Sequence, residues 1–256
     1  QAIVEGETYQ VNYTARLTDN IYYPISTLYE RLTQFSNGNY TALLQTDEIQ
    51  VASISPELFF QKGQFNNVDN VIISKPMKGT MPRGKTEAED QQYYKTLQTS
   101  SKDRAENVMI VDLLRNDIGR ISQSGSIKVY KLFFIEVYKT VFQMTSMVSG
   151  TLKTNTDLTQ ILTSLFPCGS ITGAPKLNTM KYIKQLESSP RGIYCGAIGL
   201  LLPTEDDKMI FNIPIRTIEY KYGQAIYGVG AGITIDSKPK DEVNEFYAKT
   251  KILEML

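Results

Sequence analysis

Residues 209–235 read MIFNIPIRTIEYKYGQAIYGVGAGITI, and this stretch decides the fold class. Apolar, β-branched and aromatic residues dominate 209–220 and again 224–235, which predicts two strands. The turn between them, at Tyr222 and Gly223, is too short for a helical crossover, so the two strands are expected to pair antiparallel. Antiparallel strands beside separate helical segments indicate an α+β fold rather than alternating βαβ units.

The rest of the chain adds elements of the same kinds. Alternating or β-branched runs predict strands over residues 8–17, 127–134, 141–148 and 194–202. A period near 3.6 predicts helices over residues 103–116, 157–165, 174–186 and 241–256. Residues 80–104 are expected to form a loop that enters a helix. Because no linker divides the chain, we expect one catalytic domain over residues 1–256.

Composition excludes several classes of function. The chain balances 27 Lys and Arg against 27 Asp and Glu, so its charge indicates neither a nucleic acid nor an acidic membrane as partner. It has no histidine, which excludes Ser-His-Asp catalysis and imidazole zinc sites and leaves oxygen ligands for any metal.

Two further features concern the environment of the protein. Cys168 and Cys195 lie outside any CxxC pattern, and no apolar run approaches the roughly 18 residues of a membrane span, so a reducing cytoplasm is expected. The chain begins at Gln1 close to a predicted strand, and we expect an N-terminal part to be missing.

Three glycine-rich segments are candidate anion sites: residues 169–173 (GSITG), 192–199 and 228–232 (GVGAG). The first lacks the Gly-Lys-Ser/Thr ending of a P-loop, and is interpreted as a helix start with Ser170 or Thr172 as the cap. Free N–H groups there favour a carboxylate or phosphate. At 228–232, bare backbone lets a ligand approach closely, although a structural turn or bulge explains the glycines equally well.

Lys78 lies between two prolines in the segment KPMKGTMPR. A lysine with a depressed pKa can act as a nucleophile, whereas an exposed loop lysine is the commoner outcome. A Schiff-base enzyme that uses Lys78 is one rival function, and borohydride trapping would reveal it.

The helix over residues 241–256 brings Glu242, Glu245 and Lys249 to one face. The simpler explanation is a solvated face with an i, i+4 Glu–Lys pair worth about 0.3 kcal/mol. Together with Glu106, the two glutamates are also candidate ligands of a magnesium ion, which prefers carboxylates and water. Carboxylates so distant in sequence are ordinarily unrelated surface groups.

Eight segments, taken in order, resemble successive motifs of the chorismate-utilising enzymes. They are GETYQVNYTARL (6–17), KPMKGTMPRG (75–84), AENVMIVDLLRNDIGRI (105–121), FPCGSITGAPK (166–176), RGIYCGAIG (191–199), IPIRT (213–217), GVGAGITIDS (228–237) and DEVNEFYAKTK (241–251). The resemblance implies an α+β fold like that of anthranilate synthase component I, with antiparallel sheets packed against helices. The nearest likeness is to the aminodeoxychorismate synthase component I group, which converts chorismate and ammonia to 4-amino-4-deoxychorismate for para-aminobenzoate and folate biosynthesis.

The resemblance also implies roles for particular residues. It places magnesium on Glu106 and Glu245, with Glu242 in support, bridging to the ring carboxylate of chorismate. It assigns the substrate's carboxylates to Arg216, Lys249 and the backbone at Gly230, Ala231 and Gly232, with Tyr194, Ser170 and Thr172 around them.

Three positions distinguish reactions within the family. Aminodeoxychorismate synthases carry a lysine at the position of Lys78, where anthranilate synthases usually have alanine. That lysine is implied to attack ring carbon 2 and to be expelled when ammonia adds at carbon 4. Gln10 stands where isochorismate formers have a water-activating lysine, and Gln143 where anthranilate synthases have histidine.

The implied partners are chorismate and a separate glutamine amidotransferase subunit that supplies ammonia. Amidotransferase chemistry needs a Cys and a His, and this chain has no histidine. Two alternatives stay open: anthranilate synthase component I, and a catalytically silent chorismate-binding module.

Overall fold

The computed structural model of the protein describes residues 1–35, 38–221 and 223–255. The chain forms two compact units: unit 1 comprises Gln1–Glu57, Pro167–Ile198 and Asn212–Leu256, and unit 2 comprises Leu58–Phe166 and Gly199–Phe211. Within the described ranges, no helix is both long enough and apolar enough to cross a bilayer. The expectation of a single domain over residues 1–256 stays a prediction.

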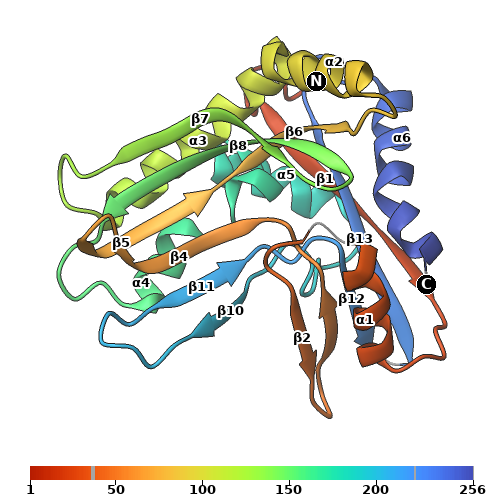
Figure 1. The fold of residues 1–256 in the computed structure, drawn as a ribbon, viewed down its shortest axis with the longest axis horizontal. Coiled ribbons are helices and arrows are strands. Elements are labelled where there is room, and N and C mark those ends of the chain that lie inside the picture. The colour runs from red at the N-terminus through yellow and green to blue at the C-terminus, as the bar shows by residue number, and fades with distance from the viewer. Residues whose placement is uncertain (36–37, 222, 256) are drawn as a thin grey trace. The chain divides into compact units, whose positions relative to one another are not determined.

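Unit 1 is built on one sheet with helices packed against it (Figure 1). Its strands, in order across the sheet, are β2 (Ala42–Gln45), β3 (Gln50–Ser53), β12 (Thr217–Lys221), β13 (Gln224–Ile233), β1 (Gln10–Asp19) and β9 (Gly173–Ala174). Its helices are α1 (Ile25–Phe35), α5 (Lys176–Leu186) and α6 (Pro239–Thr250), with 3-10 turns at Gly169–Ile171 and Lys251–Met255.

The core of unit 1 lies between α1 and the sheet. Ile25, Leu28 and Leu32 recur at helical spacing on one face of α1 and are at most 1% exposed. They pack with the buried side chains of Ile218 and Tyr227. This amphipathic helix was not predicted, because three apolar positions in a polar segment give a weak periodic signal.

Unit 2 carries a second sheet. Its strands are β10 (Ile198–Leu201), β11 (Met209–Asn212), β4 (Leu58–Phe65), β5 (Val68–Lys75), β8 (Val141–Thr151) and β6 (Met77–Pro82) in that order, and β7 (Lys128–Val137) pairs with β8. Helices α2 (Glu87–Thr99), α3 (Ser101–Ile121) and α4 (Leu158–Leu165) complete the unit. In Figure 1, α3 runs beside β8, which it contacts.

The predicted α+β class is confirmed, since every strand pair with a described register is antiparallel. The antiparallel pairing predicted for the last two strands is that of β12 with β13. Of the turn predicted between them, Tyr222 lies outside the described residues. The four predicted helices correspond to α3, α4, α5 and α6.

Two local predictions were wrong. The strand predicted over 209–220 is two strands in different sheets, interrupted where Arg216 takes a φ of 50°. The strand predicted over 194–202 begins only at Ile198, because Cys195 has a φ of 63°, outside the extended region. The loop that enters a helix, predicted over 80–104, is present: residues 83–86 lead into α2, which a capping box between Thr86 and Glu89 starts.

Candidate functional site

Glycine at positions 228, 230 and 232 leaves one face of β13 without side chains along that stretch. A Cβ added at Gly228 would lie 2.2 Å from the Tyr194 ring, and one added at Gly232 would lie 2.0 Å from Nε2 of Gln10. The register with β1 is regular throughout, so the segment is neither a turn nor a bulge. Glycine is required here because neighbouring side chains occupy the space over the strand.

Gln10 of unit 1 has a buried side-chain amide whose hydrogen-bonding groups are available to a ligand. It is the first residue of β1 and is 1% exposed. Neither Nε2 nor Oε1 of its amide has a hydrogen-bond partner in the described part of the chain. Burying an amide without partners costs roughly 2–7 kcal/mol, so this position fits a polar ligand that would satisfy it.

Arg216 supplies a partly buried cation in the same unit. Burial lowers the pKa of its guanidinium, an effect that Tyr227 and Glu57 oppose. Its side chain makes no ion pair or hydrogen bond within residues 1–35, 38–221 and 223–255. Burial likewise raises the pKa of Tyr227 to about 12, which keeps that phenol neutral beside the cation. A desolvated guanidinium that forms no hydrogen bond or ion pair with a carboxylate of the described chain suits an anionic ligand.

On α6 the structure brings together only part of the predicted cluster. Lys249 Nζ lies 2.6 Å from Glu245 Oε1 and donates to the Gly230 carbonyl at 2.6 Å. The i, i+4 ion pair of the simpler explanation is therefore present. Glu242 instead accepts a hydrogen bond from Ser237 at 2.6 Å through Oε1, and its buried Oε2 has no described partner. Ala231, between Gly230 and Gly232, is fully buried.

The segment before α5 differs from the prediction. Helix α5 begins at Lys176 with Pro175 at the N-cap position, and no side chain caps it. The Thr172 hydroxyl donates instead to the Cys168 carbonyl at 2.8 Å, within the 3-10 turn that contains Ser170. The cap prediction was wrong because strand β9 intervenes between this turn and the helix. Ser170 and Thr172 are both buried.

In unit 2, Lys78 lies at a β-bulge. Met77 of β6 is paired with Thr145 of β8 and Thr80 with Gln143, so three steps along β6 match two along β8. The extra residue falls at Lys78 and Gly79, and Gly79 has a φ of 85°. Within the described residues, the Lys78 ammonium forms no hydrogen bond or ion pair. Bulges of this kind re-aim a side chain and are frequent near active sites.

Gln143, marked by the sequence as a discriminating position, contacts this bulge on both sides. Its Nε2 donates to the Gly79 carbonyl at 2.8 Å, and its Oε1 accepts from the Thr80 hydroxyl at 2.8 Å. Glu106 is half-buried on α3, next to the fully buried Asn107. Asn107 in turn accepts a hydrogen bond from Ser146 of β8 at 2.5 Å.

The predicted magnesium ligands are divided between the units: Glu106 belongs to unit 2, and Glu242 and Glu245 belong to unit 1. No group of three or more His, Cys, Asp or Glu side chains suited to a metal is found among the described residues. The chemistry of Glu242 nevertheless fits a hard cation, since its buried carboxylate oxygen Oε2 lacks a donor. The magnesium site stays a prediction.

Arg191 connects three segments of unit 1, a role that its place in the RGIYCGAIG segment does not indicate. Its guanidinium contacts Glu187 at 2.7 Å, the Ile171 carbonyl at 2.6 Å and the Asn12 carbonyl at 2.8 Å. It thereby ties β1 to the turn that holds Ser170. The i, i+4 spacing of Glu187 and Arg191 was the available signal, but it falls beyond the end of α5.

Two other features lack the properties of a reactive site. Burial raises the pKa of the Cys168 thiol to about 11 and that of Cys195 to about 12, so both stay protonated at neutral pH.

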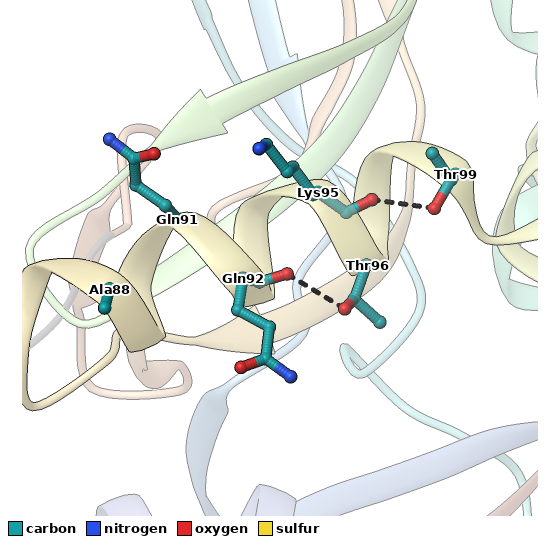
Figure 2. A pocket seen from close by; sticks show the side chains of 6 residues that line it. All are labelled: Ala88, Gln91, Gln92, Lys95, Thr96 and Thr99. Atoms are coloured by element: carbon teal, nitrogen blue, oxygen red, sulfur yellow. Dashed lines mark hydrogen bonds between the residues drawn. The ribbon is translucent and has the colours of Figure 1, made fainter.

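Figure 2 shows a hollow along α2 lined by Ala88, Gln91, Gln92, Lys95, Thr96 and Thr99. Its threonine hydroxyls donate to carbonyls of their own helix, and every lining residue is exposed.

Comparisons with known proteins agree with the motifs. The family of chorismate binding enzymes matches residues 1–255. Aminodeoxychorismate synthase component 1 from Bacillus subtilis is 40% identical over 97% of this chain and 52% of its own length. Anthranilate synthase component 1 3 from Haloarcula marismortui is 35% identical over 99% of this chain and 49% of its own.

Solved structures show the same relationship. The crystal structure of anthranilate synthase component I from Streptococcus pneumoniae superposes with a TM-score of 0.84 at 30% identity, covering 97% of this chain and 55% of that one. The chain thus spans about half the length of these relatives. On its sequence motifs, its fold and these matches, the chain belongs to the family of chorismate-binding enzymes.

Proposed function

We propose that the chain carries the catalytic part of an aminodeoxychorismate synthase component I, which forms 4-amino-4-deoxychorismate from chorismate and ammonia. Lys78 carries the proposal. It is an amine without an ion-pair partner among the described residues, placed at a bulge that Gln143 closes. The 40% identity to a relative of that name supports the same reaction.

Chorismate is a dianion, and unit 1 offers matching groups. Arg216 is a desolvated cation whose side chain forms no hydrogen bond or ion pair in the described chain, and the Gln10 amide is buried with neither end satisfied. Lys249 and the glycine-bearing backbone of β13 lie next to each other at Gly230. In the proposal these groups bind the substrate's carboxylates through charge-assisted hydrogen bonds and backbone contacts.

The proposed reaction has two displacement steps. The Lys78 nitrogen forms a bond to ring carbon 2 through its lone pair, the two conjugated double bonds of the ring shift, and the carbon 4–oxygen bond breaks. The departing hydroxide takes the proton released by the new ammonium and leaves as water. Ammonia then bonds to carbon 4, the double bonds shift back, and the carbon–nitrogen bond to Lys78 breaks as the lysine nitrogen takes the proton that the new ammonium at carbon 4 releases. No electrons are lost or gained overall.

Glu106, Glu242 and Glu245 are the residues proposed to hold magnesium. When bound, the ion would neutralise the ring carboxylate of chorismate and so reduce the repulsion between the dianion and these carboxylates. Ammonia is proposed to come from a separate glutamine amidotransferase subunit, consistent with the words "component 1" in the relative's name. The proposed location is the cytoplasm.

A product assay tests the proposal. The protein is mixed with chorismate, magnesium and a high ammonium concentration, and the products are identified by mass spectrometry. The Lys78→Ala variant should lose aminodeoxychorismate formation, while Lys95→Ala, which removes an exposed lysine of α2 in the same unit, should not. Undiminished product from Lys78→Ala would show that Lys78 is not the nucleophile.

Anthranilate synthase component I is the second candidate, favoured by the names of the Haloarcula and Streptococcus relatives. The same assay separates the two, because anthranilate lacks the enolpyruvyl group that aminodeoxychorismate retains. Binding of chorismate without turnover would favour the silent binding module.

A further inference from the structure

We infer that Gln143 is a positioning residue, which holds the β6 bulge and therefore Lys78 in the shape that amine transfer requires. The inference rests on the proposed function for its catalytic consequence. Its structural part stands on contacts within unit 2.

The bulge depends on side-chain hydrogen bonds because the regular strand pairing is interrupted there. Between the paired residues Met77 and Thr80, Lys78 and Gly79 have no regular partner on β8. The direction in which a bulged residue points depends on the local backbone angles, and Gly79 has a left-handed φ of 85° that few other residues adopt. Without further bonds, the position of Lys78 would be weakly determined.

Gln143 supplies bonds where the pairing fails. It is 6% exposed, and it uses both ends of its amide on the bulge. The Gly79 carbonyl can only accept, so Nε2 must face it, and this leaves Oε1 to accept from the Thr80 hydroxyl. A side chain that lacks a donor or an acceptor cannot make both bonds.

Helix α3 also contacts the bulge. A Cβ added at Gly79 would lie 2.9 Å from Cβ, Cγ and Oδ1 of Asp103. The glycine therefore fits against the Asp103 side chain while its carbonyl is bound to Gln143. Lys78 directly precedes this clamped residue, so releasing the carbonyl gives the Lys78 backbone freedom to turn.

Three variants separate positioning from general stabilisation. Gln143→Met keeps the length of the side chain and removes both bonds, whereas Gln143→Glu keeps the acceptor and removes the donor to Gly79. Ser74→Ala is the matched control: the Ser74 hydroxyl is buried in β5 of the same sheet and donates to the Phe59 carbonyl at 2.6 Å. Ser74→Ala thus also removes a buried side-chain bond to backbone, away from the bulge.

Two measurements are made on each variant. Hydrogen exchange of the peptide over residues 76–83 measures how well ordered the bulge is, independently of activity. Steady-state kinetics with chorismate and ammonium give kcat and KM for the folded protein. For Gln143→Met we expect faster exchange confined to this peptide and a kcat lowered by roughly 10- to 100-fold, because small misplacements of a reacting group carry penalties of this size. The KM for chorismate should change little.

The outcomes are distinct. Gln143→Glu should resemble Gln143→Met in exchange and kcat, and Ser74→Ala should keep wild-type kcat. Unchanged exchange at 76–83 in Gln143→Met, or faster exchange with an unchanged kcat, would overturn the inference. If kcat fell no further in Gln143→Met than in Ser74→Ala, Gln143 would have only a structural role and the inference would be overturned. An inactive wild-type protein would overturn the proposed function, while the exchange data would still decide whether Gln143 orders the bulge.

Discussion

The Lys249 ammonium donates to the carbonyl oxygen of Gly230 at 2.6 Å, which ties helix α6 to strand β13. Glu245 shares the same ammonium at 2.6 Å. The lysine thus brings a positive charge to the strand whose glycines make room for Tyr194 and Gln10. Because Glu245 already neutralises this charge in part, the substrate binding proposed at Lys249 would compete with an existing ion pair.

Replacing Lys249 by Met should therefore raise the KM for chorismate by about 10-fold or more, the range expected when a charge-assisted bond of roughly 1.5–3 kcal/mol is lost. The comparison variant is Lys240→Met, which removes an exposed lysine from the same helix. Initial rates over a chorismate series give both KM values. Equal KM values for the two variants would exclude Lys249 from the substrate site.

A side chain at position 232 should displace the Gln10 amide. Gly232→Ala places a Cβ 2.0 Å from Nε2 of Gln10, and we expect overpacking to cost about 1–3 kcal/mol in the free energy of unfolding. Adding Gln10→Ala should recover most of that loss, because the obstructing amide is then absent. Gly119→Ala is the control, since nothing lies within 4 Å of its added Cβ. Urea denaturation measures the wild type, the two single variants, the double variant and the control, and strict additivity of the two changes would contradict the predicted contact.

Removing Arg191 should destabilise unit 1 strongly. Its side chain is 14% exposed and that of Glu187 only 4%, so Arg191→Met leaves a buried carboxylate unpaired. We expect a loss of about 3–5 kcal/mol. The equivalent change at Arg115, whose pair with Asp112 is 52% and 74% exposed, should cost less than about 1 kcal/mol. Thermal and urea unfolding would show similar losses for both variants if burial did not control the strength of these pairs.

Magnesium should make the Glu242→Gln variant less stable than the wild-type protein, although without the ion it is at least as stable. Without the ion, Glu242→Gln removes a charge from a carboxylate whose buried Oε2 has no described partner, and should leave stability unchanged or raised. With saturating magnesium, the wild-type protein should gain stability that the variant does not, because only a bound state is stabilised by its ligand. Melting temperatures with and without magnesium test this. The exposed Asp241→Asn change on the same helix is the control.

The two buried thiols should make the fold sensitive to alkali. Their pKa values in the folded protein are raised from 9.0 to about 11 at Cys168 and about 12 at Cys195. Above pH 9 the unfolded chain releases these protons while the folded chain holds them, so the contribution is complete below pH 9 and disappears as the pH passes 11–12. Each thiol should lower the free energy of unfolding by about 1.4 kcal/mol per pH unit in this window.

The Cys195→Ala variant checks this sign. Its unfolding free energy should fall less steeply between pH 9 and 11 than that of the wild type, whatever its constant offset at neutral pH. Parallel pH profiles for the two proteins would show that Cys195 does not ionise on unfolding in this range. Denaturation at closely spaced pH values resolves the slope.

Local sequence patterns predicted much of the fold. The α+β class, the four predicted helices and the pairing of β12 with β13 follow from periodicity and a short turn, which are properties of neighbouring residues. Helix α1 and the break at Arg216 were missed because packing against distant strands and an unusual φ decide them.

The sequence by itself determined the fold class and the set of candidate groups, from Lys78 in its motif to the glycines of β13. Only the tertiary structure decided which of these groups already have partners. It pairs Lys249 with Glu245, leaves both ends of the Gln10 amide unsatisfied among the described residues, and joins Gln143 to a glycine 64 positions away. A hydrogen bond depends on two atoms that meet in space, and strand pairing brings them together across separations that no local pattern records.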